Sequence, residues 1–236
     1  MTFPVIESVT DTEAPSGSES TSHVGDYPAT VNAGDLLIVV ASFGWGDGTV
    51  TEPTGYDGTI KFTTANGSSN KLSGFVKLAA GTEGGGTYTV TTGESSQGLL
   101  RCIRVSGWYG TISGGVEFGT ASTGSDDSPD APSLTPAWGS ADTLWLDIFG
   151  NDNPYNTVSS YPTNYTAAGT YAVTSSNGSP SGIGSSYRNY AAASENPGVV
   201  TLDGSIAWVA NTIAVRPAAA SPVGFIMLAS GDGGFL

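Results

Sequence analysis

The chain carries one strand-and-turn pattern in both of its halves. Residues 28–56 run from a proline through polar residues to a Gly-Asp pair, continue as an apolar stretch that ends in Phe-Gly at Phe43, and close with Pro-Thr-Gly-Tyr. Residues 132–165 follow the same plan with Ala-Asp in place of Gly-Asp, and they have Phe149 in the second Phe-Gly and Pro-Thr-Asn-Tyr after it. A repeated block of this kind predicts a repeated structural unit.

The correspondence continues beyond these blocks. Residues 77–90 align with residues 189–202, which places Glu83 on Glu195, and each half then closes with an apolar strand. The closing strands are residues 99–105 and 208–215. Because the repeated residues are those of strands and turns and not a catalytic set, the repeat favours a scaffold or binding protein.

The composition indicates an all-β fold. The 236 residues include 34 Gly, and 38% of them are hydrophobic and 10% aromatic, which suits many turns around an apolar core. No segment has apolar residues at i, i+3, i+4 and i+7 over about ten positions, so we expect very little helix. The expected strands are residues 2–10, 35–43, 71–79, 87–92, 99–105, 143–149, 166–174, 183–191, 199–202 and 206–215, with a short strand at 116–118.

The repeat allows two architectures, either two small tandem sandwiches or two halves that interleave into one larger sandwich. A small unit has a marginal core, and the connector between the halves lacks the character of a linker. We therefore favour a single jelly-roll-like β-sandwich over residues 1–217, with an internal pseudo-twofold duplication of 28–109 and 132–217. The N-terminal strand belongs to neither repeat, and residues 218–236 form a C-terminal extension.

Charge excludes several classes of partner. The net charge is −14 and only seven residues are Lys or Arg, so the chain lacks the basic cluster that nucleic acid requires and would be repelled by an anionic bilayer. The N-terminus has no signal-peptide pattern, and no stretch approaches the roughly 20 apolar residues of a membrane span. We expect synthesis in a cytoplasm.

Cys102 is the single cysteine, and its apolar surroundings predict a buried, inert thiol.

The candidate catalytic residues favour a protein that is not an enzyme. His23 is the only histidine, and its alternating sequence context predicts a surface or edge-strand residue. No Gly-x-Ser-x-Gly motif is present. Carboxylates for glycoside hydrolysis would come from Asp126, Asp127 and Asp130 in a turn-rich loop, or from Asp147, whose alternation with a tryptophan allows it to face solvent.

Calcium is the one metal for which the chain offers candidate ligands. Asn151, Asp152 and Asn153 follow a strand and Asp47 lies between two glycines, but no full ligand spacing is present and ordinary turns explain these residues. We expect no cofactor. Aromatic side chains could form a carbohydrate platform, although strand tyrosines more often pack on a core. These aromatic residues are Trp45, Tyr56, Tyr155, Tyr161, Tyr165, Tyr187 and Tyr190.

The C-terminal extension combines a flexible Ala/Ser/Pro lead with an apolar segment. Such a segment favours burial, either as a strand added to its own sheet or against a neighbouring subunit. The predicted partner-binding residues are Val223, Phe225, Ile226, Met227, Leu228, Phe235 and Leu236.

Three motifs resemble a domain that is common in structural proteins of tailed bacteriophages. The motifs are a Gly-Asp-Leu-Leu strand at 34–37, a Pro-x-Gly-aromatic turn at 53–56 and a Gly-x-Glu turn at 81–83. The resemblance covers most of residues 1–217, although the turn has Gly-Tyr where phage proteins usually have Gly-Trp. It implies a virion component and carries over no catalytic residues.

Three functional hypotheses follow. The first is a capsid decoration or cement protein on the outer head surface, which would be a homo-oligomer bound to the major capsid protein. The second is a tail fibre or receptor-binding module that recognises a host glycan. The third is a glycan hydrolase, which the lack of a catalytic set disfavours.

Overall fold

The computed structural model describes residues 2–15, 17–45, 48–58, 61–152, 155–175 and 178–219. Within these ranges the protein consists of strands, turns and loops without helix, which confirms the all-β prediction. The first half contains β1 (Val5–Ala14), β2 (Ser20–Asp26), β3 (Leu36–Phe43), β4 (Val50–Thr51), β5 (Phe62–Asn66), β6 (Asn70–Leu78), β7 (Thr87–Ser96) and β8 (Gly98–Ser106). The second half contains β9 (Val116–Phe118), β10 (Ser122–Asp126), β11 (Asp130–Ala131), β12 (Ala141–Asn151), β13 (Val158–Ser160), β14 (Thr166–Ala167), β15 (Ala172–Val173), β16 (Gly182–Ala192), β17 (Gly198–Val199), β18 (Thr201–Leu202) and β19 (Ile206–Val215).

Each half builds its own sheets. The first half has a five-stranded sheet in the order β1-β8-β3-β6-β5 and a three-stranded sheet in the order β2-β7-β4. The second half has a large sheet in the order β10-β19-β12-β16-β14, to which β9 and β15 also pair, and two small ladders, β11-β17 and β13-β18. Among the described strands, every ladder is antiparallel and joins strands of the same half. The halves therefore stack as units, whereas the sequence favoured one sandwich in which they interleave.

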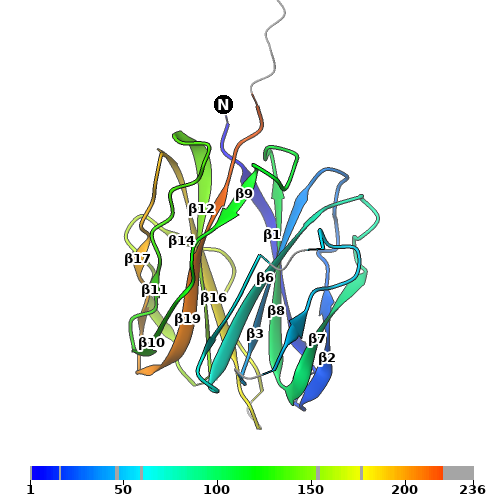
Figure 1. The fold of residues 1–236 in the computed structure, drawn as a ribbon, viewed down its shortest axis with the longest axis vertical. Coiled ribbons are helices and arrows are strands. Elements are labelled where there is room, and N and C mark those ends of the chain that lie inside the picture. The colour runs from blue at the N-terminus through cyan, green and yellow to red at the C-terminus, as the bar shows by residue number, and fades with distance from the viewer. Residues whose placement is uncertain are drawn as a thin grey trace, which may run out of the picture.

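The stacking follows from strands that are apolar on both faces. All eight residues of β3 are buried, so this strand needs a covering layer on each side. Leu36 and Ile38 join the central core with Leu146 of β12, while Leu37 and Val39 join the core of the first half. Figure 1 shows the resulting four layers edge-on, with β11 and β17 at one side, the two large sheets in the middle, and β2 and β7 at the other side.

The two halves share a strand order. The order β8-β3-β6 in the first half corresponds to β19-β12-β16 in the second, with β1 beside β8 and β10 beside β19. This agreement is what the sequence repeat predicts. It also gives the N-terminal strand a counterpart, β10, which the sequence did not reveal because β10 is a polar edge strand, Ser-Thr-Gly-Ser-Asp.

The repeated Phe-Gly has a tertiary cause. A Cβ atom added at Gly44 would overlap the backbone oxygen of Ser179, and one added at Gly150 would overlap the hydroxyl of Ser42. Each glycine thus lies in close contact with the other half of the chain. The two glycines at equivalent positions allow the large sheets to approach each other at this end of the stack.

Two expected segments differ from the structure. The expected strands leave residues 11–22 outside any strand, but β1 continues to Ala14 and β2 begins at Ser20. Residues 166–174 were expected to form one strand, but only the two-residue strands β14 and β15 lie there. Gly169, with a φ of 86°, turns the chain between them.

The described chain begins and ends at the same end of the molecule. Val5 pairs with Ser106, Trp108 forms a bridge with Pro217, and the backbone N–H of Ala218 donates to the oxygen of Gly107 at 2.9 Å. Figure 1 shows the N-terminus beside the last described residues after β19 at this end. Because β3 and β12 run away from it, the loops that follow them lie at the opposite end.

Candidate functional site

The first of the three resembling motifs is held by a buried ion pair. Asp35, in the Gly-Asp turn before β3, accepts hydrogen bonds from Nε of Arg104 at 2.5 Å and from the backbone N–H of Asn32 at 2.8 Å. Both charged residues are buried. Gly34 accepts a further hydrogen bond from the indole Nε1 of Trp108 at 2.8 Å. The aspartate therefore ties the start of β3 to β8, and its role is structural.

The third motif is an acidic turn. The carboxylate of Glu83 accepts the backbone N–H groups of Ala80, Gly81 and Thr82 at 2.9–3.0 Å and pairs with Nζ of Lys77 at 3.1 Å. Burial alone would raise the pKa of Glu83, but the N–H donors and Lys77 outweigh it and lower this pKa to about 2. The carboxylate stays ionised and holds the turn closed.

The second motif supplies an aromatic wall beside that ion pair. Tyr56 packs edge-on against Phe75 and lies near Tyr88. The ammonium group of Lys77 lies 5.9 Å from the ring centre of Tyr56 and 5.8 Å from that of Tyr27. All three motifs therefore contribute contacts that form the first half.

The second half has a related arrangement at the aligned glutamate. Nη1 of Arg188 donates to Oε1 of Glu195 at 2.9 Å, and the hydroxyl of Tyr165 donates to the same oxygen at 3.3 Å. Arg188 also stacks on Tyr190, 3.9 Å from the ring centre. The repeated glutamate thus binds a cation from β6 in one half and from β16 in the other.

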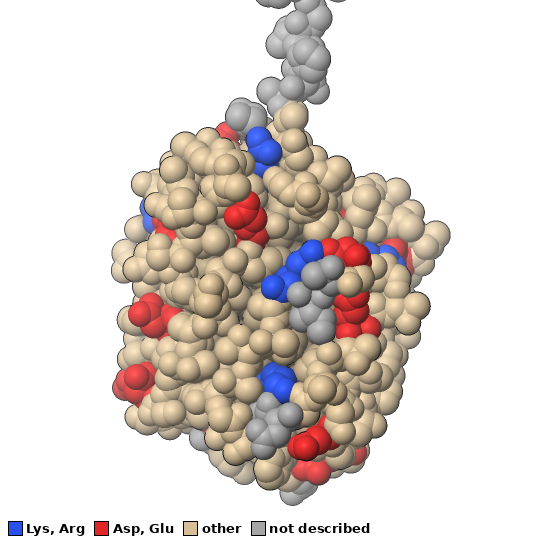
Figure 2. All heavy atoms as spheres, viewed as in Figure 1, with Lys and Arg blue, Asp and Glu red and all other residues tan. Residues whose placement is uncertain are grey.

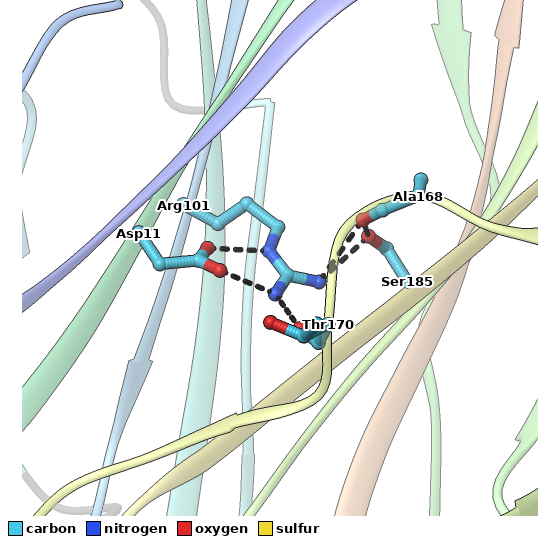
Figure 3. A network of polar contacts seen from close by, with 5 residues as sticks. All are labelled: Asp11, Arg101, Ala168, Thr170 and Ser185. Atoms are coloured by element: carbon cyan, nitrogen blue, oxygen red, sulfur yellow. Dashed lines mark hydrogen bonds and ion pairs between the residues drawn. The ribbon is translucent and has the colours of Figure 1, made fainter.

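Arg101 forms a buried polar network between the two large sheets (Figure 3). Its guanidinium group is fully buried and makes a two-pronged ion pair with Asp11, at 2.6 Å from Nε and 2.8 Å from Nη2. It also donates to the backbone oxygens of Ala168 and Thr170 and, at 2.8 Å, to the hydroxyl of Ser185. The network joins β1 and β8 to the second half. Its sequence signal is a single cation inside the apolar run Gly-Leu-Leu-Arg-Cys-Ile, which the sequence analysis did not single out.

Of the two positions predicted for His23, a surface or an edge strand, the structure has the edge strand. His23 lies on the edge strand β2, yet its side chain is fully buried and packs against Phe43 at a centroid distance of 4.8 Å. Its ring nitrogens lie 2.6 Å from the oxygen of Ala14 and 3.0 Å from the hydroxyl of Thr92. Burial lowers the pKa of His23. The histidine is a core residue with both nitrogens engaged.

The acidic candidates are not brought together. Asp126, Asp127 and Asp130 are exposed near the loop between β10 and β11, where Asp126 accepts the backbone N–H of Ser128 at 2.9 Å. Asp147, for which the sequence allowed a position that faces solvent, is fully buried in β12. The two small ladders, β11-β17 and β13-β18, cover the face of the sheet on which Asp147 lies. The alternation of Asp147 with Trp145 in the sequence could not reveal this covering layer. Cys102, expected to be buried, is buried, and burial raises its pKa to about 12.

The calcium candidates are divided. Asp47 and Asn153 lie outside the described residues, and the buried side chain of Asn151 donates to the hydroxyl of Tyr171 at 2.8 Å. In the described part of the chain, no group of three or more His, Cys, Asp and Glu side chains could hold a metal ion. The partner-binding residues predicted between 223 and 236 also lie outside the described ranges.

The aromatic candidates separate by exposure. Tyr155, Trp45 and Tyr190 are 75%, 46% and 41% exposed. Tyr56, Tyr161, Tyr165 and Tyr187 are half-buried. Trp45 and Tyr155 follow β3 and β12 respectively, at the end of the molecule opposite to the described chain ends.

Comparison with known proteins identifies no relative. No known protein family, curated protein or solved structure matches the chain. Within the described residues, no helix is long and apolar enough to cross a membrane.

Proposed function

We propose that the chain is a non-enzymatic structural protein of a bacteriophage virion, and that it decorates the outer surface of the head. The observation that carries this proposal is that the three motifs resembling phage structural domains all make fold-forming contacts. Asp35 binds Arg104, Glu83 closes its turn, and Tyr56 packs beside Lys77. The motifs thus behave as the signature of a fold, in keeping with a resemblance that concerns architecture.

The proposal extends to the origin of the fold. We infer that each half is a jelly-roll-like unit and that the two arose by duplication. The shared strand order and the paired glycines, Gly44 and Gly150, support this inference. Superposition of residues 35–105 on 143–215 should place Phe43 on Phe149 and Ile103 on Ile213. Poor overlap of the central strands would contradict a duplication.

The shape of the molecule suits attachment by one end. The described chain begins and ends at the same end, and the stacked sheets extend away from it (Figure 1). A net charge of −14 favours a solvated surface, and Figure 2 shows acidic groups scattered over the face in view, with few basic ones. We propose that the apolar C-terminal extension anchors the protein to the major capsid protein and to neighbouring copies.

Deletion of residues 219–236 tests this anchor. Each buried apolar side chain contributes about 1.5–3 kcal/mol before the ordering cost, so several together can hold a protein on a shell. The truncated protein should keep its circular dichroism spectrum and melting temperature but should cosediment less with the virions of the phage that encodes it. Normal cosedimentation would refute the anchor, and a much lower melting temperature would assign the segment to the protein's own core.

A second candidate is a tail fibre or receptor-binding module. The exposed aromatic side chains at the end opposite to the described chain ends favour it, since such groups bind sugars through their faces. Quantitative gel analysis of purified virions separates the two candidates. Hundreds of copies per particle indicate decoration, whereas a handful indicate a tail component.

A further inference from the structure

A cleft lies at the end of the molecule opposite to the described chain ends. It has a volume of about 260 Å³ and is formed by loops of both halves. This cleft is here called the end cleft. Its lining includes Trp45, Ser68 and Ser69 from the first half and Asp152, Ser179 and Pro180 from the second.

The end cleft is built from equivalent loops of the two repeats. Trp45 follows the first Phe-Gly and Asp152 follows the second, while Ser69 directly precedes β6 and Pro180 lies shortly before β16. The loops meet at Gly44, whose lack of a Cβ atom allows the backbone of Ser179 and Pro180 from the other half to approach closely. Neither half alone contains the cleft, so it is a product of their stacking.

Buried hydrogen bonds support the cleft from below. The hydroxyl of Ser181 lies 2.7 Å from that of Ser42, and Nδ2 of Asn70 donates to the same Ser42 oxygen at 3.2 Å. Ser42, Asn70 and Ser181 are fully buried. These bonds tie the ends of β3, β6 and the segment before β16 together, so the cleft rests on a rigid base.

Trp45 gives the cleft an apolar face. All five tryptophans lie in the described part of the chain. Trp45 is 46% exposed, whereas Trp138 is half-buried and Trp108, Trp145 and Trp208 are at most 4% exposed. The exposed part of the indole ring therefore lines the cleft as an apolar surface that a ligand can contact. The C–H face of a sugar ring is apolar and can stack on an indole.

Asp152 gives the cleft a directed hydrogen-bond acceptor. Burial raises the pKa of the Asp152 carboxyl group, while the hydroxyl of Ser69 and the backbone N–H of Ala207 act in the opposite direction, so polar groups of both halves face this carboxylate. A carboxylate accepts up to about four hydrogen bonds, so lone pairs remain for the hydroxyl groups of a ligand. Ser68 is exposed and offers a further donor and acceptor at the rim.

We propose that the end cleft binds an uncharged carbohydrate, with a sugar ring stacked on Trp45 and its hydroxyl groups donating to Asp152. The volume lies just below the roughly 300–1,000 Å³ of typical ligand pockets, which suits one ring of a longer glycan. An acidic sugar is disfavoured because the protein carries a net charge of −14 and none of the described lining residues is Lys or Arg. This site goes beyond the proposed virion role and does not rest on it, because it belongs to the isolated protein.

Saturation-transfer NMR on the full chain tests the site with three probes: cellobiose, maltose and N,N′-diacetylchitobiose. At least one probe should receive saturation on the ring protons of one face. Trp45→Ala should weaken the binding at least tenfold, and Asp152→Asn should weaken it severalfold while circular dichroism stays unchanged. Tyr109→Ala is the matched control, since Tyr109 is 37% exposed but lies at the end with the described chain ends.

Several results would overturn the proposal. One is the absence of transfer to all three probes. Another is transfer that survives both Trp45→Ala and Asp152→Asn, or that falls equally in Tyr109→Ala, because the site would then lie elsewhere. None of these results bears on attachment to virions, which the truncation experiment tests separately.

Discussion

A buried carboxyl group at position 147 should make the stability of this protein depend on pH. Asp147 is fully buried in β12, where one carboxyl oxygen accepts the hydroxyl of Ser186 at 2.9 Å and the other has no hydrogen-bond partner. Burial raises its pKa to about 7, with the negative charge of Asp130 adding to the effect and the Ser186 hydrogen bond opposing it. The carboxyl group is therefore protonated in the folded protein under mildly acidic conditions.

The sign of the effect follows from the two pKa values. Between the unfolded pKa of 3.8 and the folded pKa of about 7, the folded state binds a proton that the unfolded state does not, so the free energy of unfolding falls as the pH rises. The whole difference corresponds to about 4 kcal/mol, of which about 3 kcal/mol is lost between pH 5 and pH 8. Above the folded pKa the contribution is gone.

The substitution Asp147→Asn removes this titration and nearly keeps the shape. At pH 5 the variant should be less stable by about 1–3 kcal/mol, because the buried amide N–H groups lack acceptors. At pH 8 that deficit should shrink or reverse by about 3 kcal/mol, because the wild-type protein has lost its contribution. We therefore expect the difference in unfolding free energy between the wild type and Asp147→Asn to change with pH.

Urea unfolding followed by tryptophan fluorescence at several values between pH 5 and pH 8 measures the difference. The lowered pKa of His23 gives a slope of the opposite sign, because its contribution to the free energy of unfolding is lost as the pH falls below 6.5. This contribution is the same in the variant and the wild type, so it cancels when the two proteins are compared. Asp127→Asn, at an exposed position, serves as the control and should follow the wild-type slope. Parallel curves for wild type and Asp147→Asn would show that water reaches the carboxylate, and would refute the reasoning.

Two further predictions concern the stacking of the halves. Gly44→Ala and Gly150→Ala should each cost about 1–3 kcal/mol or more in unfolding free energy, because each added Cβ overlaps the other half; Gly204→Ala, which meets only ordinary contacts, should cost less. Equal costs at all three glycines in a thermal melt would contradict close approach at the Phe-Gly positions. Asp11→Ala should cost about 3–5 kcal/mol by leaving the buried Arg101 cation unpaired, and adding Arg101→Leu should recover part of that loss in a double-mutant cycle. Additive losses would mean that the two side chains do not interact.

The sequence was sufficient for the parts of the fold that depend on local pattern. An apolar run such as residues 36–43, which has the length of a strand and is bounded by turn residues, favours a strand covered on both faces, and the alternation in β7 places Tyr88 and Val90 inside. The repeated motifs also located the turns at Glu83 and Glu195, since the Gly, Asn and Pro residues beside them supply the backbone conformations that turns require.

Local pattern could not show which layer covers a polar residue. His23 and Asp147 have polar side chains in alternating segments, a pattern that is compatible with exposure, yet both side chains are fully buried. The same limit hid the Arg101 network, whose partners in the second half are about 70–85 residues away along the chain.

The sequence by itself determined that the protein is all-β and where the central strands and motif turns lie, and its repeated motifs predict that the two halves follow one plan. Those properties depend on side-chain periodicity and turn chemistry over a few residues. Only the tertiary structure decided that the halves stack as units, that both Phe-Gly glycines lie at their contact, and that Trp45 and Asp152 share a cleft. Those properties depend on surfaces that meet only after each half has formed its sheets, and a one-dimensional pattern carries no record of which surfaces meet.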